Sequence, residues 1–279
     1  MKTILRIFIL VAFTVGLNSC DKIEGPVKEV VAPPAGSRKV LVEDFTGHKC
    51  GNCPRASKAI YDLKAIYGDR LIIMAIHAGG FATPFPPSAP YYTYDFRTPE
   101  GTELDTDFGI SVAGNPNGMV NRRQVNGSYI IGSTKWGDEV SAVFSNTTPV
   151  PVALTISNNF NSSTRLLETE IKTEFFETLS GNYKLCVYMV EDSIKNWQKD
   201  YDATPEDIEF YNHREVLRGT MNGTYGEIVT PTLIGEISTL NYSKTLDPTW
   251  SEQHFSIVAY LYNEATKEII QVEQREIEN

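Results

Sequence analysis

The sequence has 279 residues, of which 41% are hydrophobic and 22% charged, so it describes a globular protein long enough for two modest domains. Its 35 acidic and 25 basic side chains give a net charge of −10, which argues against nucleic-acid binding because phosphates need a basic surface. The scattered histidines do not pair with cysteines at zinc-ligand spacing, so we expect no metal and no cofactor.

The first 19 residues are typical of a bacterial signal peptide, with a basic start and a short apolar run. They end in L-N-S-C, which resembles the lipobox and implies cleavage before Cys20 and acylation of that cysteine. The alternative is an ordinary signal peptide with a chance cysteine. No other apolar run approaches transmembrane length. Residues 20–39 mix charge with Pro and Gly and are interpreted as a linker between the membrane and the folded part.

The stretch V-L-V-E-D-F-T-G-H-K-C-G-N-C-P, residues 40–54, predicts a buried strand, a turn, a C-x-x-C pair and a helix. This order of elements resembles the start of a thioredoxin-like fold. We expect Cys50 at the start of the helix, where free N–H groups and the helix dipole stabilise a thiolate, and Cys53 as its disulfide partner. A purely structural disulfide is the open alternative.

Four more residues are candidates for assisting the thiols. Either Asp44 or Glu43, at the end of the strand, is expected beneath them to relay a proton. Lys49 would lower the pKa of the neighbouring thiol and is a candidate substrate contact. His77 ends the next buried strand, and is either a substrate contact or a polar residue bonded to a loop.

Residues 40–147 follow the order of a thioredoxin-like domain. A helix and a buried strand complete a β-α-β unit, and residues 78–107 then form a long insertion rich in Gly, Pro and aromatics. That insertion is expected either to bind a partner beside the thiols or to pack on its own domain.

The dipeptide Asn115-Pro116 lies where thioredoxin-like proteins carry a cis-proline that faces the C-x-x-C pair. In that family the residue before the proline offers its backbone to an extended substrate. We expect the cis form here, with a trans bond in a plain turn as the alternative. A hairpin through Asn126-Gly127 and a helix capped by Ser133 or Thr134, with Trp136, Val140, Val143 and Phe144 on its apolar face, end the domain.

Residues 150–279 change to a periodicity of two, which indicates antiparallel strands without helices. This pattern favours an immunoglobulin-like β-sandwich as a second domain. Cys186 falls within a strand and is interpreted as a buried free thiol. Residues 197–226 interrupt the strands and are interpreted as a solvated acidic loop rather than a calcium site, because they lack EF-hand spacing. The expected strands are 152–157, 167–175, 183–191, 232–237, 255–262 and 269–275.

The lipobox, E-D-F-T-G-x-x-C-G-N-C-P, N-P-N-G-M-V-N-R and H-R-E-V-L-R-G together are similar to the outer membrane protein 28-related lipoproteins of Bacteroides-type bacteria. The resemblance spans the mature chain and implies a lipid-anchored protein at the outer membrane of a Gram-negative bacterium, facing the periplasm or the cell surface. Adhesin or receptor roles are suggested for that family. Thioredoxin-type catalysts usually carry Trp before the first cysteine, whereas this chain has Lys49, so part of the usual substrate platform is absent.

Two functions remain open at this point. The first is a thiol–disulfide oxidoreductase acting on exported proteins, in which Cys50 attacks, Cys53 resolves and Asn115-Pro116 holds the substrate. The second is a non-enzymatic surface binding protein or adhesin whose Cys50–Cys53 bond is structural. The chemistry favours the first, which requires the sulfur atoms to lie in a groove that is open to a partner and shared with Pro116.

Overall fold

The computed structural model describes residues 37–277, so the predicted signal peptide, Cys20 and most of the linker lie outside the described residues. Within this range no helix is long and apolar enough to cross a membrane. The fold is mixed α/β with mostly strands. Its helices are α1 (Cys53–Tyr67), α2 (Pro99–Phe108), α3 (Ile110–Ala113) and α4 (Trp136–Phe144). Its strands are β1 (Val40–Thr46), β2 (Leu71–His77), β3 (Asn117–Val120), β4 (Ile131–Gly132), β5 (Val152–Asn161), β6 (Leu166–Phe175), β7 (Tyr183–Glu191), β8 (Ile194–Lys199), β9 (Asp207–His213), β10 (Val216–Thr220), β11 (Glu227–Ile228), β12 (Ile237–Thr245), β13 (Phe255–Asn263) and β14 (Ile269–Glu276).

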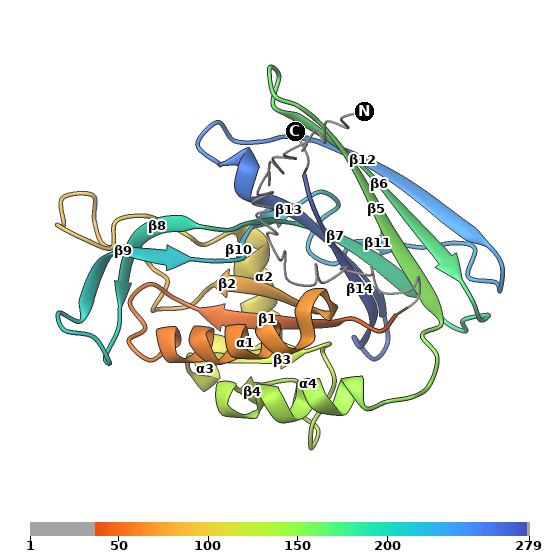
Figure 1. Cartoon of the computed structure of the whole chain (residues 1–279), viewed down its shortest axis with the longest axis horizontal. Helices are drawn as coiled ribbons and strands as arrows, with labels where there is room; N and C mark the ends of the chain where they lie inside the picture. The colour runs from red at the N-terminus through yellow and green to blue at the C-terminus, as the bar shows by residue number, and fades with distance from the viewer. Residues whose placement is uncertain (1–36, 278–279) are drawn as a thin grey trace, which may run out of the picture. The chain divides into compact units, whose positions relative to one another are not determined.

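One nine-stranded sheet runs through the described region in the order β14-β13-β7-β10-β2-β1-β3-β4, with β11 paired to β7 (Figure 1). β1 and β2 are parallel, as the intervening helix α1 requires, and β3 lies antiparallel to β1 on its other side. β10 is parallel to β2 and antiparallel to β7. It therefore joins strands from the two halves of the chain.

Helices cover both faces of the sheet around β1 and β2. Alternate side chains of β1 point to opposite faces, as in any strand. Val42 packs with Ile60 of α1 and Val140 of α4, whereas Leu41 packs with Leu104 of α2. Both faces are buried, which is why β1 and β2 show nearly continuous apolar runs in sequence.

A three-stranded sheet, β12-β6-β5, packs against the part of the large sheet formed by β7 and β13. The predicted alternation in β6 is confirmed, since Leu167, Ile171 and Phe175 face this core while Glu168 and Lys172 face outward. Residues 150–277 contain no α-helix, as expected.

The expected boundary at residues 147–150 does not divide two separate cores. One hydrophobic cluster contains Leu41 and Met74 from the first half together with Cys186 and Tyr260 from the second. All described residues belong to one compact unit. The strands after residue 150 are therefore not an independent sandwich, because β7, β10, β13 and β14 continue the sheet of β1 and β2.

The insertion 78–107 is partly ordered, because helix α2 begins at Pro99 with Thr98 accepting a hydrogen bond from the Gly101 N–H. Two sequence expectations about local structure were wrong. The expected strand 232–237 is instead a loop up to Ile237, where β12 begins. The segment 197–226 is not an irregular loop, since it contains β9, β10 and the end of β8.

Candidate functional site

The C-x-x-C pair lies between the end of β1 and the start of α1. Cys50 and Cys53 form a disulfide, with their Cα atoms 5.4 Å apart. The expectation for Cys50 needs a correction: α1 begins at Cys53, and Cys50 lies in the preceding turn. That turn is closed by hydrogen bonds from the Cys50 N–H to the Gly47 carbonyl and from the Cys53 N–H to the Cys50 carbonyl.

Asp44 lies beneath Cys53, on the face of β1 that α1 covers. Both residues line a small cavity of about 20 Å³, which also touches Thr46 and His77 and has room for about one water molecule. The Asp44 side chain is buried, and no donor within residues 37–277 reaches its Oδ1. Burial raises the pKa of this carboxyl from 3.8 to about 7, because desolvation disfavours the charged form. Asp44 can therefore hold or release a proton near neutral pH.

Glu43, the other carboxylate candidate, does not lie under the cysteines. As the neighbour of Asp44 it points to the opposite face of β1, where it forms a fully buried ion pair with Arg122. The two atoms Oε1 of Glu43 and Nη2 of Arg122 are 2.6 Å apart, and Arg122 also donates to the Tyr260 hydroxyl. This pair connects β1 to β13 in the core. Glu43 is therefore not part of the disulfide site.

Three histidines surround the ring of Phe96 near the disulfide. The rings of His77 and His213 lie 4.5 Å from that ring, and His48 lies 5.8 Å from it, measured between centroids. Burial is the main cause that lowers the pKa of all three, to about 4 for His48 and His213. His77 is 3% exposed, so it is not the surface contact considered for a substrate; it lines the cavity beneath Cys53.

The Asn115–Pro116 peptide bond is cis, and Pro116 directly precedes β3. In the antiparallel register Asn117 is opposite Phe45, so Pro116 lies beside Thr46, at the end of β1 from which the cysteine turn departs. Both polar atoms of the Asn115 side chain are buried, with no partner among residues 37–277. The register therefore brings Asn115-Pro116 to the same end of the sheet as the disulfide.

The sulfur atoms do not lie in an open groove, contrary to expectation. Cys50 and Cys53 are each only 2% exposed. They are covered by a hairpin, β8–β9 with its connecting turn (residues 194–213), which lies beside the cysteine turn in Figure 1. Lys49 is partly exposed beside this cover, and its ammonium group lies over the Phe85 ring, 4.6 Å from the centroid.

The aromatic insertion supports this hairpin. Trp197 of β8 packs against Tyr91 and Tyr92, and the Tyr92 hydroxyl donates to Asp207 of β9 at 2.5 Å. Tyr92, which is 4% exposed, thus packs on the hairpin from the second half of the chain as well as on His48 of its own predicted domain, so it is not open to a partner. Phe81 and Phe85 remain exposed beside the cysteine turn.

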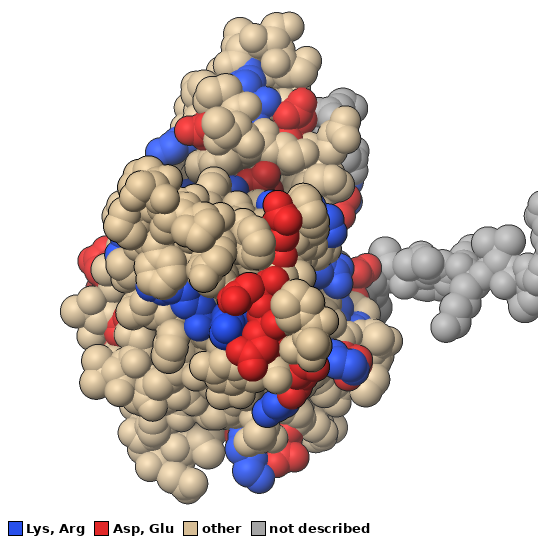
Figure 2. Space-filling view, turned by 90° about the vertical axis from the view of Figure 1, so that its left-hand side faces the viewer, with Lys and Arg blue, Asp and Glu red and all other residues tan. Residues whose placement is uncertain are grey.

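Three acidic residues of the hairpin are paired with cations. Arg55 binds Asp202 through two hydrogen bonds, and Lys199 contacts Glu206 and Asp207. Figure 2 views the molecule from this side and shows basic side chains directly beside acidic ones, in a band between large uncharged areas. In the part of the chain that the structure describes, no group of His, Cys, Asp or Glu has metal-binding geometry.

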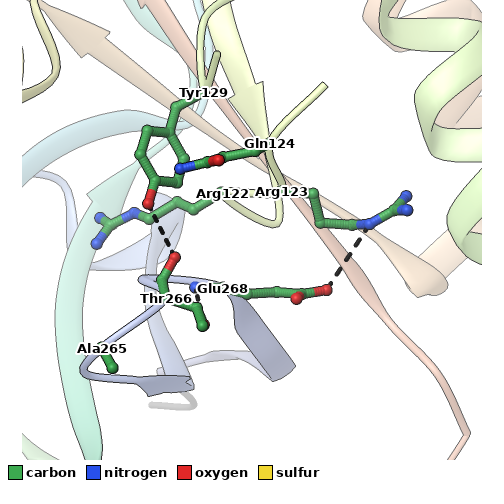
Figure 3. Close-up of a pocket in the computed structure, with 7 residues that line it drawn as sticks. All are labelled: Arg122, Arg123, Gln124, Tyr129, Ala265, Thr266 and Glu268. Carbon is green, nitrogen blue, oxygen red and sulfur yellow. Dashed lines mark hydrogen bonds and ion pairs between the residues drawn. The ribbon is translucent and has the colours of Figure 1, made fainter. Parts of the chain in front are cut away.

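A second hollow lies between the turn after β3 and the β13–β14 turn (Figure 3). Its two arginines do not converge on a common point: in Figure 3 the guanidinium groups of Arg122 and Arg123 point away from each other. Arg123 pairs with Glu268 at 3.7 Å, and the Tyr129 hydroxyl donates to the Thr266 carbonyl. The hollow therefore has no focused charge for binding an anion.

Cys186 is a buried free thiol, as predicted. It lies in β7 in the core, where burial raises the pKa of its thiol to about 12. It takes no part in the disulfide site.

Sequence comparison identifies the family. A family model described as outer membrane protein Omp28 matches residues 104–279, more than half of the chain, so the protein belongs to the Omp28 family. The predicted family and outer-membrane location are thereby confirmed. The match includes β8 and β9 but not Cys50 and Cys53. A search of curated proteins finds no match.

Solved structures share the fold at low sequence identity. HBP35 of Porphyromonas gingivalis aligns with a TM-score of 0.66 and 15% identity, over 87% of this chain and 76% of that chain. A structural-genomics protein from Agrobacterium tumefaciens aligns with a TM-score of 0.51 and 14% identity, over 87% and 96%. A domain of the outer membrane lipoprotein Omp28 from P. gingivalis aligns over 46% of this chain with 20% identity, but its TM-score of 0.33 bears no weight for the fold.

Proposed function

We propose that this Omp28-family protein is a cell-envelope lipoprotein with a thioredoxin-like region at 40–147, which shares its sheet and core with the rest of the chain, and that its Cys50–Cys53 pair exchanges disulfides with exported proteins. Cys20 would carry the lipid anchor. Three features support the thioredoxin-like assignment: a parallel β1-α1-β2 unit, an antiparallel β3–β4 pair beside β1, and helix α4 packed with α1. Asn115-Pro116, at the same end of the sheet, would hold the partner's extended backbone.

The observation that carries this proposal is the buried, unpaired carboxyl of Asp44 beside Cys53. A structural disulfide has no need of such a group, and keeping it buried costs stability. A redox pair does need it, because the resolving thiol must lose a proton inside the protein, away from bulk solvent. A carboxyl whose pKa is raised to about 7 can accept that proton and return it near neutral pH.

The exchange follows with atoms and electrons balanced. The Cys50 thiolate attacks one sulfur of the partner's disulfide, and the partner's other sulfur leaves as a thiolate that solvent protonates. Asp44 then takes the Cys53 proton, and the Cys53 thiolate attacks the Cys50 sulfur. The second partner thiolate leaves and receives the proton from Asp44. The partner gains two thiols, and Cys50–Cys53 becomes oxidised; the reverse sequence oxidises the partner.

One observation favours the second function, a non-enzymatic binding protein with a structural disulfide. Both cysteines are 2% exposed, so in this conformation neither sulfur is open to a partner. In that case the exposed aromatic side chains of the insertion, with the strands after residue 150, would provide the binding surface.

Trapping of the mixed disulfide separates the two functions. Cys53→Ser, made in the full chain and expressed in the envelope of its own bacterium, removes the resolving thiol. A mixed disulfide between Cys50 and a partner protein then persists. Exchange predicts new covalent adducts with other envelope proteins that disappear on reduction, whereas Cys50→Ser forms none, because it lacks the thiol that attacks the partner. If Cys53→Ser yields no more adducts than the Cys50→Ser control, the exchange function is wrong.

A further inference from the structure

The β8–β9 hairpin is hydrogen-bonded as a sheet of two strands, separate from the other sheets of the described region. Its turn is attached to the cysteine segment by backbone hydrogen bonds. The Lys199 N–H donates to the His48 carbonyl at 2.8 Å, and the Tyr201 N–H donates to the Gly51 carbonyl at 2.9 Å. The end of β8 and the start of the turn thus lie along the residues flanking Cys50 and satisfy two of their carbonyl groups.

Side chains complete this cover. The Tyr201 ring rests on Gly51 so closely that a Cβ at position 51 would lie 2.5 Å from its ring carbons. Gln198, on the same strand, donates from its buried amide to the Cys50 carbonyl at 3.1 Å. Arg55, in the first turn of α1, binds the Asp202 carboxylate at 2.6 and 2.9 Å. The hairpin therefore binds mainly to backbone carbonyl groups and to Gly51 in the segment around the disulfide.

The hairpin is firmly held at its base and weakly held at its tip. At the base His213 is 4% exposed and its ring contacts the Trp197 carbonyl, and Gln198, just before the tip, is 3% exposed. At the tip Tyr201 is 54% exposed, and the side chains of Arg55 and Asp202 are 62% and 59% exposed. Exposed ion pairs hold weakly, and segments with few buried contacts open locally without global unfolding.

We propose that the tip of the β8–β9 hairpin (residues 199–206) is a lid that occupies the partner-binding groove of the Cys50–Cys53 centre, and that an extended segment of a partner protein must displace it to reach Cys50. This inference rests on the proposed exchange function. The partner segment takes over the two backbone hydrogen bonds that Lys199 and Tyr201 now donate, so the same carbonyls serve the closed and the engaged states. The lid keeps the disulfide from unselective reductants until a partner binds.

The rate at which dithiothreitol reduces the disulfide in the folded chain measures opening of the lid. Gly51→Ala introduces a Cβ that wedges against the Tyr201 ring, and reduction should accelerate about tenfold or more, as expected for an overpacked contact. Gly132→Ala is the matched control, because its Cβ would meet only the Asn117 side chain at an ordinary 3.6 Å. Its reduction rate should equal that of the wild type.

A second variant acts through the ion pair and leaves Gly51 untouched. Arg55→Glu turns attraction to Asp202 into repulsion and should accelerate reduction about fivefold, the factor that corresponds to about 1 kcal/mol. The swap Arg55→Glu with Asp202→Arg restores the pair and the local charge, and should restore the slow rate. Hydrogen exchange at the Lys199 and Tyr201 amides should rise and fall in parallel, while urea unfolding stays close to wild type.

The lid proposal is overturned if reduction of the wild type occurs only at the rate of global unfolding, or if all variants change the rate only as much as they change global stability. It is equally overturned if the wild-type disulfide is reduced as fast as in the unfolded chain. Failure of the exchange function gives a different result. In that case the lid variants still accelerate reduction, but Cys53→Ser traps no partner.

Discussion

Replacement of Asp44 by Asn should stabilise the protein, and the gain should depend on pH. In the unfolded chain an aspartate ionises near 3.8, whereas burial raises the pKa of Asp44 to about 7 in the folded protein. Between these two values the unfolded state releases a proton that the folded state retains. The destabilisation caused by Asp44 is therefore about zero below pH 3.8. It increases as the pH rises and levels off above about pH 7.

The difference between 3.8 and about 7 corresponds to about 4 kcal/mol at its full extent. Asparagine has nearly the same shape and also needs hydrogen bonds, so it keeps the desolvation cost of a neutral polar group and removes only the cost of charge. We therefore expect Asp44→Asn to raise the free energy of unfolding by about 2–4 kcal/mol at pH 8 and by about zero near pH 3.5.

Urea unfolding of both proteins, followed by tryptophan fluorescence at several pH values, measures this gain as a difference in which other titrating groups cancel. Glu43→Gln is the matched control one residue away. It leaves Arg122 charged and without its carboxylate partner in the core, so it should destabilise by about 3 kcal/mol at pH 8, where Asp44→Asn stabilises. A gain for Asp44→Asn that is absent, or the same at pH 3.5 and pH 8, would refute the raised pKa and the proton-holding role built on it.

Three further outcomes are expected. Burial lowers the pKa of His213 from 6.5 to about 4, so below pH 6.5 the unfolded chain takes up a proton that the folded protein does not. The free energy of unfolding therefore falls on acidification, by about 2 kcal/mol at pH 5 relative to neutral pH. His213→Gln should remove this part of the pH dependence of stability. Arg122→Met should destabilise by about 3–5 kcal/mol in urea, because Glu43 loses its buried partner. Cys186, buried with its thiol pKa raised to about 12, should resist iodoacetamide in the folded protein and react only on unfolding, as mass spectrometry can show.

The local pattern of the sequence was enough to predict much of the sheet. The apolar runs of β1 and β2 and the alternation in β6 translate directly into buried faces. The C-x-x-C spacing and the N-P-N-G segment located the disulfide and the proline. The choice between Asp44 and Glu43 could not be made in the same way, because both faces of β1 are buried and the sequence does not say which one α1 covers.

The features that the sequence did not reveal depend on pairing between distant residues. Insertion of β10 between β2 and β7 joins the two halves of the chain, yet Val216-Leu217 resembles any short apolar strand. The cover over the disulfide arises from residues almost 150 positions after it. One signal was present: Ile208 and Phe210 alternate with polar residues in β9, a strand pattern that the acidic composition of the segment obscured.

The reduction potential of the Cys50–Cys53 pair tests the central claim most directly. The full chain, equilibrated in buffers of defined thiol–disulfide ratio and then alkylated, gives the fraction oxidised at each potential. An exchange centre should titrate reversibly between about −120 and −270 mV, the range of known thiol–disulfide exchange proteins. A value below about −300 mV is that of a structural disulfide and would contradict the account.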